Sequence, residues 1–159
     1  MNKLMQCKDN NNALVIFSVS APFLCGLYRD GVLVESVQLE SKTMQGLVEV
    51  FDKYRSVPIG QIFYARGPGS FTAIKLTHVF LQTWQIVHEI PVFSTDSFYF
   101  NGGTPIYAFG KQYFVKNADG EIGLQVFDEA LGCDFALPQV LDVSKFSAHN
   151  EPLYVLPPI

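Results

Sequence analysis

The sequence predicts an α/β fold in which helices pack against a mixed β-sheet. An Asp-Gly pair, Asp30-Gly31, stands between two apolar runs, which is a strong signal for an antiparallel hairpin. Farther along, two segments with helical spacing alternate with short apolar runs, as in strands joined by helical crossovers. The chain has 159 residues, 48% hydrophobic and 16% charged, which suits one globular domain with a real core.

Three strands are expected in the first 40 residues. Residues 13–20 are short, apolar and rich in β-branched side chains, as a buried strand is. Residues 23–40 predict two strands around Asp30-Gly31, because both turn residues tolerate positive φ. The polar residues 1–12 before them predict a loose leader.

Residues 41–55 and 71–89 are the predicted helices. The first has apolar side chains along one face, namely Met44, Leu47, Val48, Phe51 and Tyr54. Ser41 or Thr43 is expected to cap its N-terminus. Pro58 and Gly60 then interrupt the helical pattern before the next element.

Short apolar runs on either side of the second helix predict the fourth and fifth strands. They lie at residues 61–65 and 91–95, and Pro91 is tolerated because it starts its strand. The C-terminal third is expected to be less regular: two strands within 104–116 around Gly110-Lys111, one at 121–127, a weak strand and turn at 138–146, and an extended tail at 151–159.

The predicted order is therefore β-β-β-α-β-α-β, an antiparallel meander followed by crossovers. The ribonuclease-H-like layout has this order, and the same layout underlies the actin-like (ASKHA) ATPases. The expected fold class is accordingly a ribonuclease-H-like/actin-like mixed sheet.

Charge and composition limit the partners of the chain. Its net charge is −4 with no run of basic residues, and its pI is about 5.2, so it lacks the basic stripe of a domain that grips nucleic acid by itself. The three cysteines, Cys7, Cys25 and Cys133, are far apart in the sequence, and we expect them to be reduced thiols. No signal peptide and no membrane-spanning run is apparent, so a cytoplasmic protein is expected.

The loop Gly67-Pro68-Gly69 lies between a predicted strand and a predicted helix, as a phosphate-binding loop would. Ser70 or Thr72 could cap the helix that follows. The Gly-Lys-Ser/Thr ending of a nucleotide-binding P-loop is absent. A tight turn that only caps the helix explains the same residues at least as well as an anion site does.

Residues for catalysis or metal binding are not found in a recognisable pattern. The first strand ends in Ser18 and Ser20 and carries no acid, and the other carboxylates show no paired spacing. The histidines His78, His88 and His149 lack the spacing of a zinc pair. We therefore expect no catalytic residue, no metal site and no cofactor.

The second predicted helix has two faces that could be buried. Ile74, His78, Leu81 and Gln85 lie along one side, and Ala73, Leu76, Phe80, Trp84 and Val87 lie along another. One face can pack on the sheet while the other, with helix 41–55 beside it, docks a partner. Burial of both faces within the monomer is an equally weighted alternative.

The glycine loop belongs to a longer pattern. Residues 67–77 read Gly67-Pro68-Gly69-Ser70-Phe71-Thr72-Ala73-Ile74-Lys75-Leu76-Thr77. This segment resembles the motif G-P-G-S-F-T-G-L-R-I-G of the bacterial TsaB (YeaZ) family, with six consecutive identities. The Asp-Gly hairpin and the segments "EIPVFSTDSF", "AFGKQYFVK" and "EPLYVL" resemble that family as well, so the likeness covers nearly the whole chain, though thinly outside 61–98.

The sequence departs from the family at several positions. Ser18 stands where the family has an aspartate on its first strand, Lys75 replaces an arginine, and Ala73 and Thr77 replace glycines. Residues 95–150 are shorter than the usual second subdomain. The resemblance thus implies a ribonuclease-H-like/actin-like domain at 1–100 and a reduced C-terminal subdomain at 101–159.

The resemblance also implies a function. TsaB proteins are non-catalytic scaffold subunits of the machinery that makes threonylcarbamoyladenosine in tRNA. They pair through their first two helices with a catalytic subunit, TsaD, and an ATPase, TsaE, joins them; tRNA, metal and adenylate sit mainly on the partner. Here helices 41–55 and 71–89 would form that interface, and the expected contact residues are Leu47, Phe51, Ile74, His78 and Leu81.

Two other functions stay open from the sequence. One is a small actin-like phosphotransferase or a hydrolase acting alone through Ser70 or Thr72, which the missing acids disfavour. The other is a homodimer built on the same two helices. Self-pairing in the absence of a partner would be compatible with the scaffold role.

Overall fold

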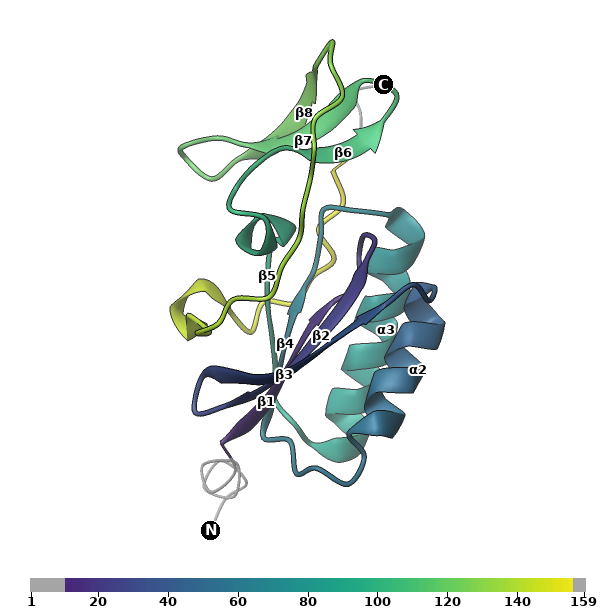
Figure 1. The fold of residues 1–159 in the computed structure, drawn as a ribbon, viewed down its shortest axis with the longest axis vertical. Coiled ribbons are helices and arrows are strands. Elements are labelled where there is room, and N and C mark those ends of the chain that lie inside the picture. The colour runs from purple at the N-terminus through teal and green to yellow at the C-terminus, as the bar shows by residue number, and fades with distance from the viewer. Residues whose placement is uncertain (1–10, 156–159) are drawn as a thin grey trace.

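The computed structural model describes residues 11–155 and contains two β-sheets and two long helices (Figure 1). The first half of the chain holds β1 (Asn12–Phe17), β2 (Phe23–Arg29), β3 (Val32–Leu39), α2 (Thr43–Lys53), β4 (Gln61–Ala65), α3 (Phe71–His88) and β5 (Val92–Thr95). The second half holds the 3₁₀ helices η1 (Ser97–Phe100) and η2 (Val143–Lys145) and the strands β6 (Ile106–Phe109), β7 (Gln112–Lys116) and β8 (Ile122–Val126).

The first five strands form one mixed sheet in the order β3-β2-β1-β4-β5. β1, β2 and β3 pair antiparallel, while β4 and β5 run parallel to β1, so the predicted mixed α/β sheet is confirmed. The hairpin turn also lies where the sequence predicts it: Asp30 and Gly31 both have positive φ, 53° and 79°.

The predicted cap of the first helix is wrong. The N-cap residue of α2 is Lys42, and its side chain makes no capping hydrogen bond. Thr43 Oγ1 instead donates to the carbonyl oxygen of Ser18 at 3.0 Å, and Ser41 Oγ donates to Glu49 at 3.2 Å. Because the end of β1 lies beside this helix terminus, the Thr43 hydroxyl finds a tertiary partner rather than a local one.

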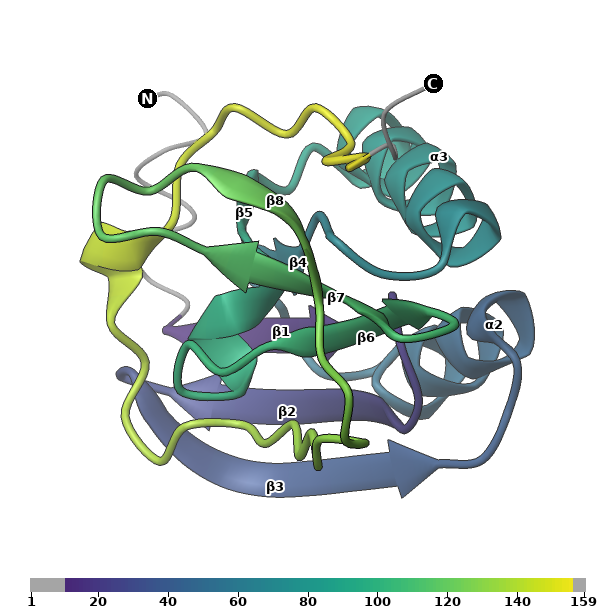
Figure 2. The same cartoon turned by 90° about the horizontal axis from the view of Figure 1, so that it is seen from above.

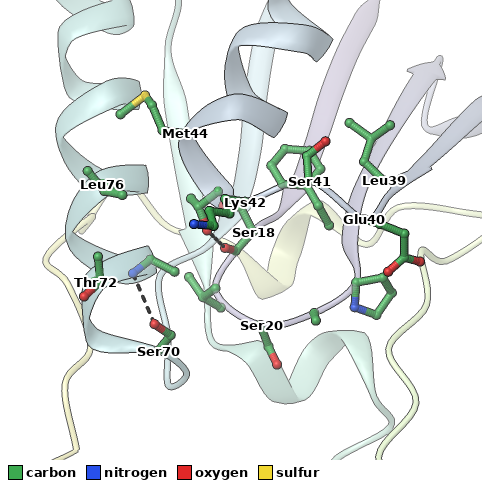
Figure 3. A pocket seen from close by; sticks show the side chains of 16 residues that line it. Ser18, Ser20, Leu39, Glu40, Ser41, Lys42, Met44, Ser70, Thr72 and Leu76 are labelled. Atoms are coloured by element: carbon green, nitrogen blue, oxygen red, sulfur yellow. Dashed lines mark hydrogen bonds between the residues drawn. The ribbon is translucent and has the colours of Figure 1, made fainter.

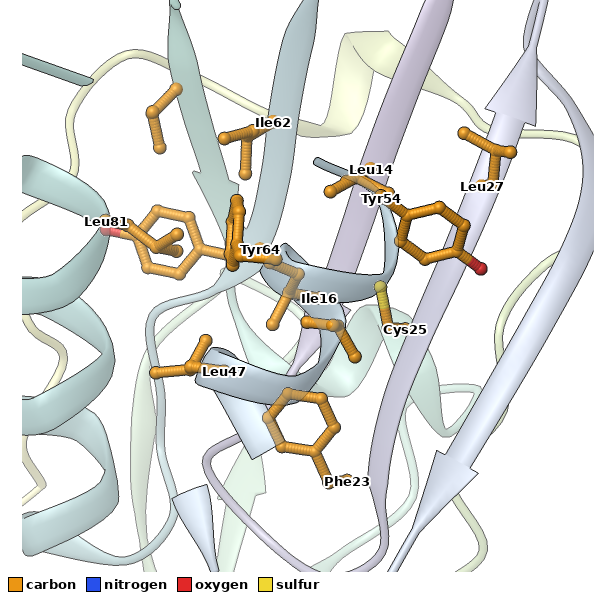
Figure 4. Packing of buried hydrophobic residues seen from close by; sticks show 13 residues of the cluster. Leu14, Ile16, Phe23, Cys25, Leu27, Leu47, Tyr54, Ile62, Tyr64 and Leu81 are labelled. Carbon is orange, nitrogen blue, oxygen red and sulfur yellow. The ribbon is translucent and has the colours of Figure 1, made fainter. Parts of the chain in front are cut away.

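The five-stranded sheet is buried on both faces. α2 and α3 lie side by side on one face (Figure 2). Leu47 of α2 and Leu81 of α3 point toward Ile16 and Tyr64 of the sheet in that layer (Figure 4). This burial explains the continuous apolar run of β1, whose alternate side chains enter opposite layers of the core.

The other face is covered by residues 133–147, which we call the strap. Its apolar side chains, Phe135, Leu137, Leu141 and Phe146, pack against the layer that contains Val15, Phe17 and Phe63. The strap also pairs with both edges of the sheet, through single bridges from Val140 to Val32 and from Ser147 to Ser94. The weak strand and turn predicted at 138–146 are therefore one bridge at Val140 followed by η2.

The second sheet has the order β6-β7-β8 and is antiparallel throughout, so all three predicted strands are confirmed. It packs its inner side chains, Ile106 and Phe114, on Phe98 of η1 and on Phe135 of the strap. The strap thus contacts both sheets. The domain boundary at residue 100 stays a prediction. Residues 1–10 of the predicted leader, with Cys7, lie outside the described residues, whereas Asn12, its last residue, already belongs to β1.

Candidate functional site

The two glycines of the loop between β4 and α3 are required by close backbone contacts. A Cβ on Gly69 would collide with the carbonyl oxygen of Val19, at the end of the first strand. A Cβ on Gly67, whose φ is +127°, would collide with the carbonyl oxygen of Leu153. The peptide bond between Gly67 and Pro68 is cis. The glycines therefore allow three chain segments to meet at one point.

The polar groups of this loop are bound to the protein itself. Ser70 N–H donates to the Val19 carbonyl at 2.8 Å. The Gly67 and Pro68 carbonyls accept from the backbone N–H and the hydroxyl of Ser97, at 2.8 and 2.7 Å. Since a phosphate cradle needs free N–H groups, the loop acts as a structural junction at these positions.

The start of α3 shows which hydroxyl caps the helix. Ser70 is the N-cap residue, and its Oγ accepts a hydrogen bond from Ala73 N–H at 3.4 Å (Figure 3). Thr72 is exposed and Phe71 packs edge-on against the ring of Tyr154. The loop and its cap together set where α3 begins.

A pocket of about 450 Å³ lies between the N-termini of α2 and α3 and the end of β1 (Figure 3). Hydroxyl side chains, including Ser20, Ser41 and Thr72, line much of it, together with Lys42 and one acid, Glu40. The positive ends of two helix dipoles meet here, which is suited to a negatively charged group. The pocket holds no pair of carboxylates for general acid–base catalysis.

The end of β1 carries a hydroxyl pair in place of a carboxylate. Ser18 Oγ and Thr77 Oγ1 lie 2.6 Å apart, and both side chains are buried. One hydroxyl thus donates a hydrogen bond to the other across the contact between β1 and α3. Among residues 11–155, no three His, Cys, Asp or Glu side chains are grouped so that they could hold a metal ion.

Cys25, on β2, is also unsuited to nucleophilic chemistry. Cys25 is fully buried beside Tyr54, and burial raises the pKa of its thiol to about 12, with a further contribution from Glu35. The thiolate is the reactive form of cysteine, so this side chain stays protonated and inert at neutral pH.

Comparison with known proteins adds to these observations. No protein-family model and no curated protein matches the sequence. Two solved structures from Pseudomonas aeruginosa do match, YeaZ and an uncharacterised protein with similarity to peptidase YeaZ, each with a TM-score of 0.56 and 14% sequence identity. The chain has the fold of YeaZ.

The YeaZ likeness is one of fold, since the identity is low. It covers 77% of this chain and 69% of the uncharacterised protein, and 80% of this chain and 65% of YeaZ itself. The chain therefore spans about two thirds of the length of these structures. None of the helices between residues 11 and 155 is both long and apolar enough to cross a membrane.

Within this YeaZ fold, four of the five predicted contact residues are core residues. Leu47, Phe51, Ile74 and Leu81 are at most 6% exposed, because each points from its helix into the sheet side of the monomer. Buried side chains cannot contact a partner protein, so the prediction that these four residues form the interface is wrong. His78 is half-buried, and its Nδ1 has no hydrogen-bond partner among the described residues.

The outward sides of the same two helices carry a different apolar set. Met44 and Val48 on α2 and Val79, Ile86 and Val87 on α3 are exposed by 38% to 77%, and we call these five residues the outer helix face. Lys75 is the one Lys, Arg, Asp or Glu in α3. Sequence periodicity did not separate this face from the core, because Met44 and Val48 fell within the stripe predicted for 41–55 and Val87 within one predicted side of 71–89. Val79 and Ile86, apolar residues outside the predicted faces, were the available signal.

Proposed function

We propose that the chain is a TsaB (YeaZ)-type scaffold subunit of the cytoplasmic machinery that makes N6-threonylcarbamoyladenosine in tRNA. In this proposal it pairs with a TsaD-type catalytic subunit and a TsaE-type ATPase, contacts tRNA only through the complex, and forms a homodimer when alone. The observation that carries the proposal is the outer helix face on a chain with the YeaZ fold.

The fold supports a finer assignment. An antiparallel meander continued by two helical crossovers, with the sheet order β3-β2-β1-β4-β5, is the arrangement we assign to the ribonuclease-H-like/actin-like (ASKHA) class. The six residues from Gly67 to Thr72 that are identical to the TsaB (YeaZ) motif form the loop and the first residues of α3, and so set the position of this helix.

The outer helix face has the chemistry of a protein interface. A helix on a solvent-facing side normally carries charged residues outward, whereas α3 exposes Val79, Ile86 and Val87. Exposed apolar side chains grouped on two neighbouring helices are typical of sites where proteins associate. The charges of Glu49, Asp52 and Lys53 on α2 form a polar border.

The proposal that the chain is not a catalyst is supported by the side chains at the end of β1, where Ser18 stands in place of a carboxylate. Metal-dependent phosphoryl transfer needs carboxylate oxygens for Mg²⁺, and here Ser18 is bound to Thr77 instead. The Ser70 oxygen accepts the capping hydrogen bond from Ala73, and among residues 11–155 no His, Asp or Glu is hydrogen-bonded to it as a general base would be. A phosphotransferase or hydrolase acting alone is the competing function.

Binding to a purified TsaD-type subunit tests the interface. We expect Ile86→Asp and Val79→Asp to abolish co-elution in size-exclusion chromatography, because a buried unpaired carboxylate opposes association. Val126→Asp, at an exposed position of β8, is the matched control and keeps binding. Normal binding by both helix variants contradicts the proposal.

A second measurement separates scaffold from enzyme. Reconstituted tRNA modification is expected to require the chain together with its TsaD- and TsaE-type partners, and to be lost with Ile86→Asp. The isolated chain is expected to show no metal-dependent turnover of ATP. Turnover by the pure chain, abolished by Ser70→Ala, would establish the competing function.

A further inference from the structure

A second cleft lies at the opposite end of the helices from the glycine loop. It has a volume of about 180 Å³ and forms where α2 and α3 end and their connections to β4 and β5 begin. Its walls are Leu14 of β1, Val57 and Ile59 after α2, and Trp84 and Ile90 at the end of α3. Phe51 and Tyr54 contribute ring surface from α2.

The interior of this cleft is apolar. Tyr54, the one lining residue with a hydroxyl group, uses it elsewhere: it donates to Glu35 at 2.6 Å and points away from Leu14 (Figure 4). The indole of Trp84 is fixed between the rings of Phe80 and His88, whose centroids lie 5.8 and 4.0 Å away. The cleft therefore has a preformed apolar wall, as small-molecule sites do.

The rim carries one permanent positive charge, on Arg55, and neither Asp nor Glu lines the cleft. The Arg55 side chain is 77% exposed, and its contact with Asp52 is a long 3.5 Å pair between two exposed groups, so the guanidinium can turn toward a ligand at little cost. The negative dipole ends of α2 and α3 lie at this cleft and oppose an anion, so the binding of a carboxylate here depends on the guanidinium of Arg55.

We propose that this cleft binds a small molecule with one apolar ring and one carboxylate. The ring would lie against Trp84, Val57 and Ile59, and the carboxylate would bond the guanidinium of Arg55 at the rim. Size limits the ligand, since an apolar cavity of about 150 Å³ accommodates benzene. The cleft shares no lining residue with the outer helix face, and this proposal does not depend on the function proposed above.

Trp84 is the single tryptophan of the chain, so its fluorescence reports directly on the cleft. Benzoate is the probe, benzyl alcohol the neutral counterpart, and free N-acetyltryptophanamide the control for non-specific quenching. We expect a saturable change with benzoate in the full-length protein, with a dissociation constant on the order of 1 mM for so small a ligand. A response that matches N-acetyltryptophanamide overturns the proposal.

Two substitutions locate the ligand. Arg55→Gln, at an exposed position, should weaken benzoate binding by up to about fivefold and leave benzyl alcohol unaffected. Val57→Phe should fill the cleft and abolish both responses, whereas Val143→Phe, which adds the same ring at an exposed site, should preserve them. Unchanged benzoate binding in both Arg55→Gln and Val57→Phe overturns the site.

Discussion

At the scale of single residues, the clearest constraint is the contact between Gly69 and the Val19 carbonyl. The peptide N–H of Ser70 bonds this same carbonyl, so the loop cannot move away from it without losing a hydrogen bond. The sequence identified these glycines as special but left their reason open. The reason is proximity of backbone to backbone, which depends on segments far apart in the sequence.

Gly69→Ala is therefore expected to destabilise the fold by about 1–3 kcal/mol, the usual cost of forcing an extra carbon into a packed site. Urea unfolding followed by circular dichroism measures this. Gly123→Ala in β8 is the matched control, because nothing lies within 4 Å of its added Cβ. Equal midpoints for the two variants would show that the loop relaxes freely.

The Ser18–Thr77 pair makes a second prediction at this scale. Ser18→Ala leaves the buried Thr77 hydroxyl without its partner and should cost about 1–3 kcal/mol. The double variant Ser18→Ala/Thr77→Val removes both hydroxyls and should recover part of that loss. Additive effects in the double-mutant cycle would contradict a direct interaction.

At the scale of elements, each helix has one side in the core and one side outward, and the apolar pattern of the sequence does not divide the two. The spacing of 41–55 correctly predicted α2, but of the five residues in its predicted apolar stripe only Leu47, Phe51 and Tyr54 are buried. It could not show that Val48 lies outside the core, because Val48 and Leu47 are adjacent and equally apolar. Which side faces the sheet depends on the entry angle of the helix, which tertiary contacts such as Thr43 with Ser18 decide.

A hydrogen bond between Tyr54, at the end of α2, and Glu35, on β3, makes the contact between these two elements dependent on pH. This bond, together with Lys53, lowers the pKa of the Glu35 carboxyl below its usual value. A lowered pKa in the folded state means that the stabilisation is present above the unfolded-state pKa and is lost as pH falls through the folded-state value.

Tyr54→Phe should accordingly be less stable than the wild type at neutral pH, and the difference should shrink as the solution is acidified through the pKa of Glu35. Urea midpoints of both proteins at a series of pH values between neutral and strongly acidic test this. Glu129→Gln, at an exposed position after β8, is a control for general charge effects. A difference that stays constant on acidification would contradict the linkage.

At the scale of the whole molecule, the strap closes the core. Phe135 stacks on Phe17 with ring centroids 4.3 Å apart, and Phe146 meets Phe63 edge-on at 5.0 Å. The strap has almost no regular secondary structure, so neither helical nor strand periodicity could reveal it. The sequence thus predicted the strands, the helices and their order, and missed the segment that joins the two sheets.

Phe146→Ala should destabilise the protein by about 1–3 kcal/mol, because the ring is partly buried and contacts both Phe63 and Tyr99. Its transition in thermal unfolding is expected to fall well below that of Val143→Ala, an exposed neighbour in η2. A truncation after residue 132 should bind a hydrophobic dye, since one face of the sheet then keeps only the cover that Tyr99 and Phe100 of η1 provide. Wild-type behaviour of both variants would show that the strap is dispensable.

The position of the strap in the chain has a consequence during synthesis. All five strands of the first sheet are complete at Thr95, and Tyr99 and Phe100 follow directly, but the strap residues that cover the rest of its second face and pair with its two edges are translated only from residue 133 onward. The nascent chain therefore carries the strands of the sheet with an apolar face and two open edges while the segment between Thr95 and residue 133 is being made. At about 5–20 residues per second, this interval lasts on the order of a few seconds. Such a chain is a natural client for a holding chaperone, and its yield in a cell should depend on how quickly translation passes this interval.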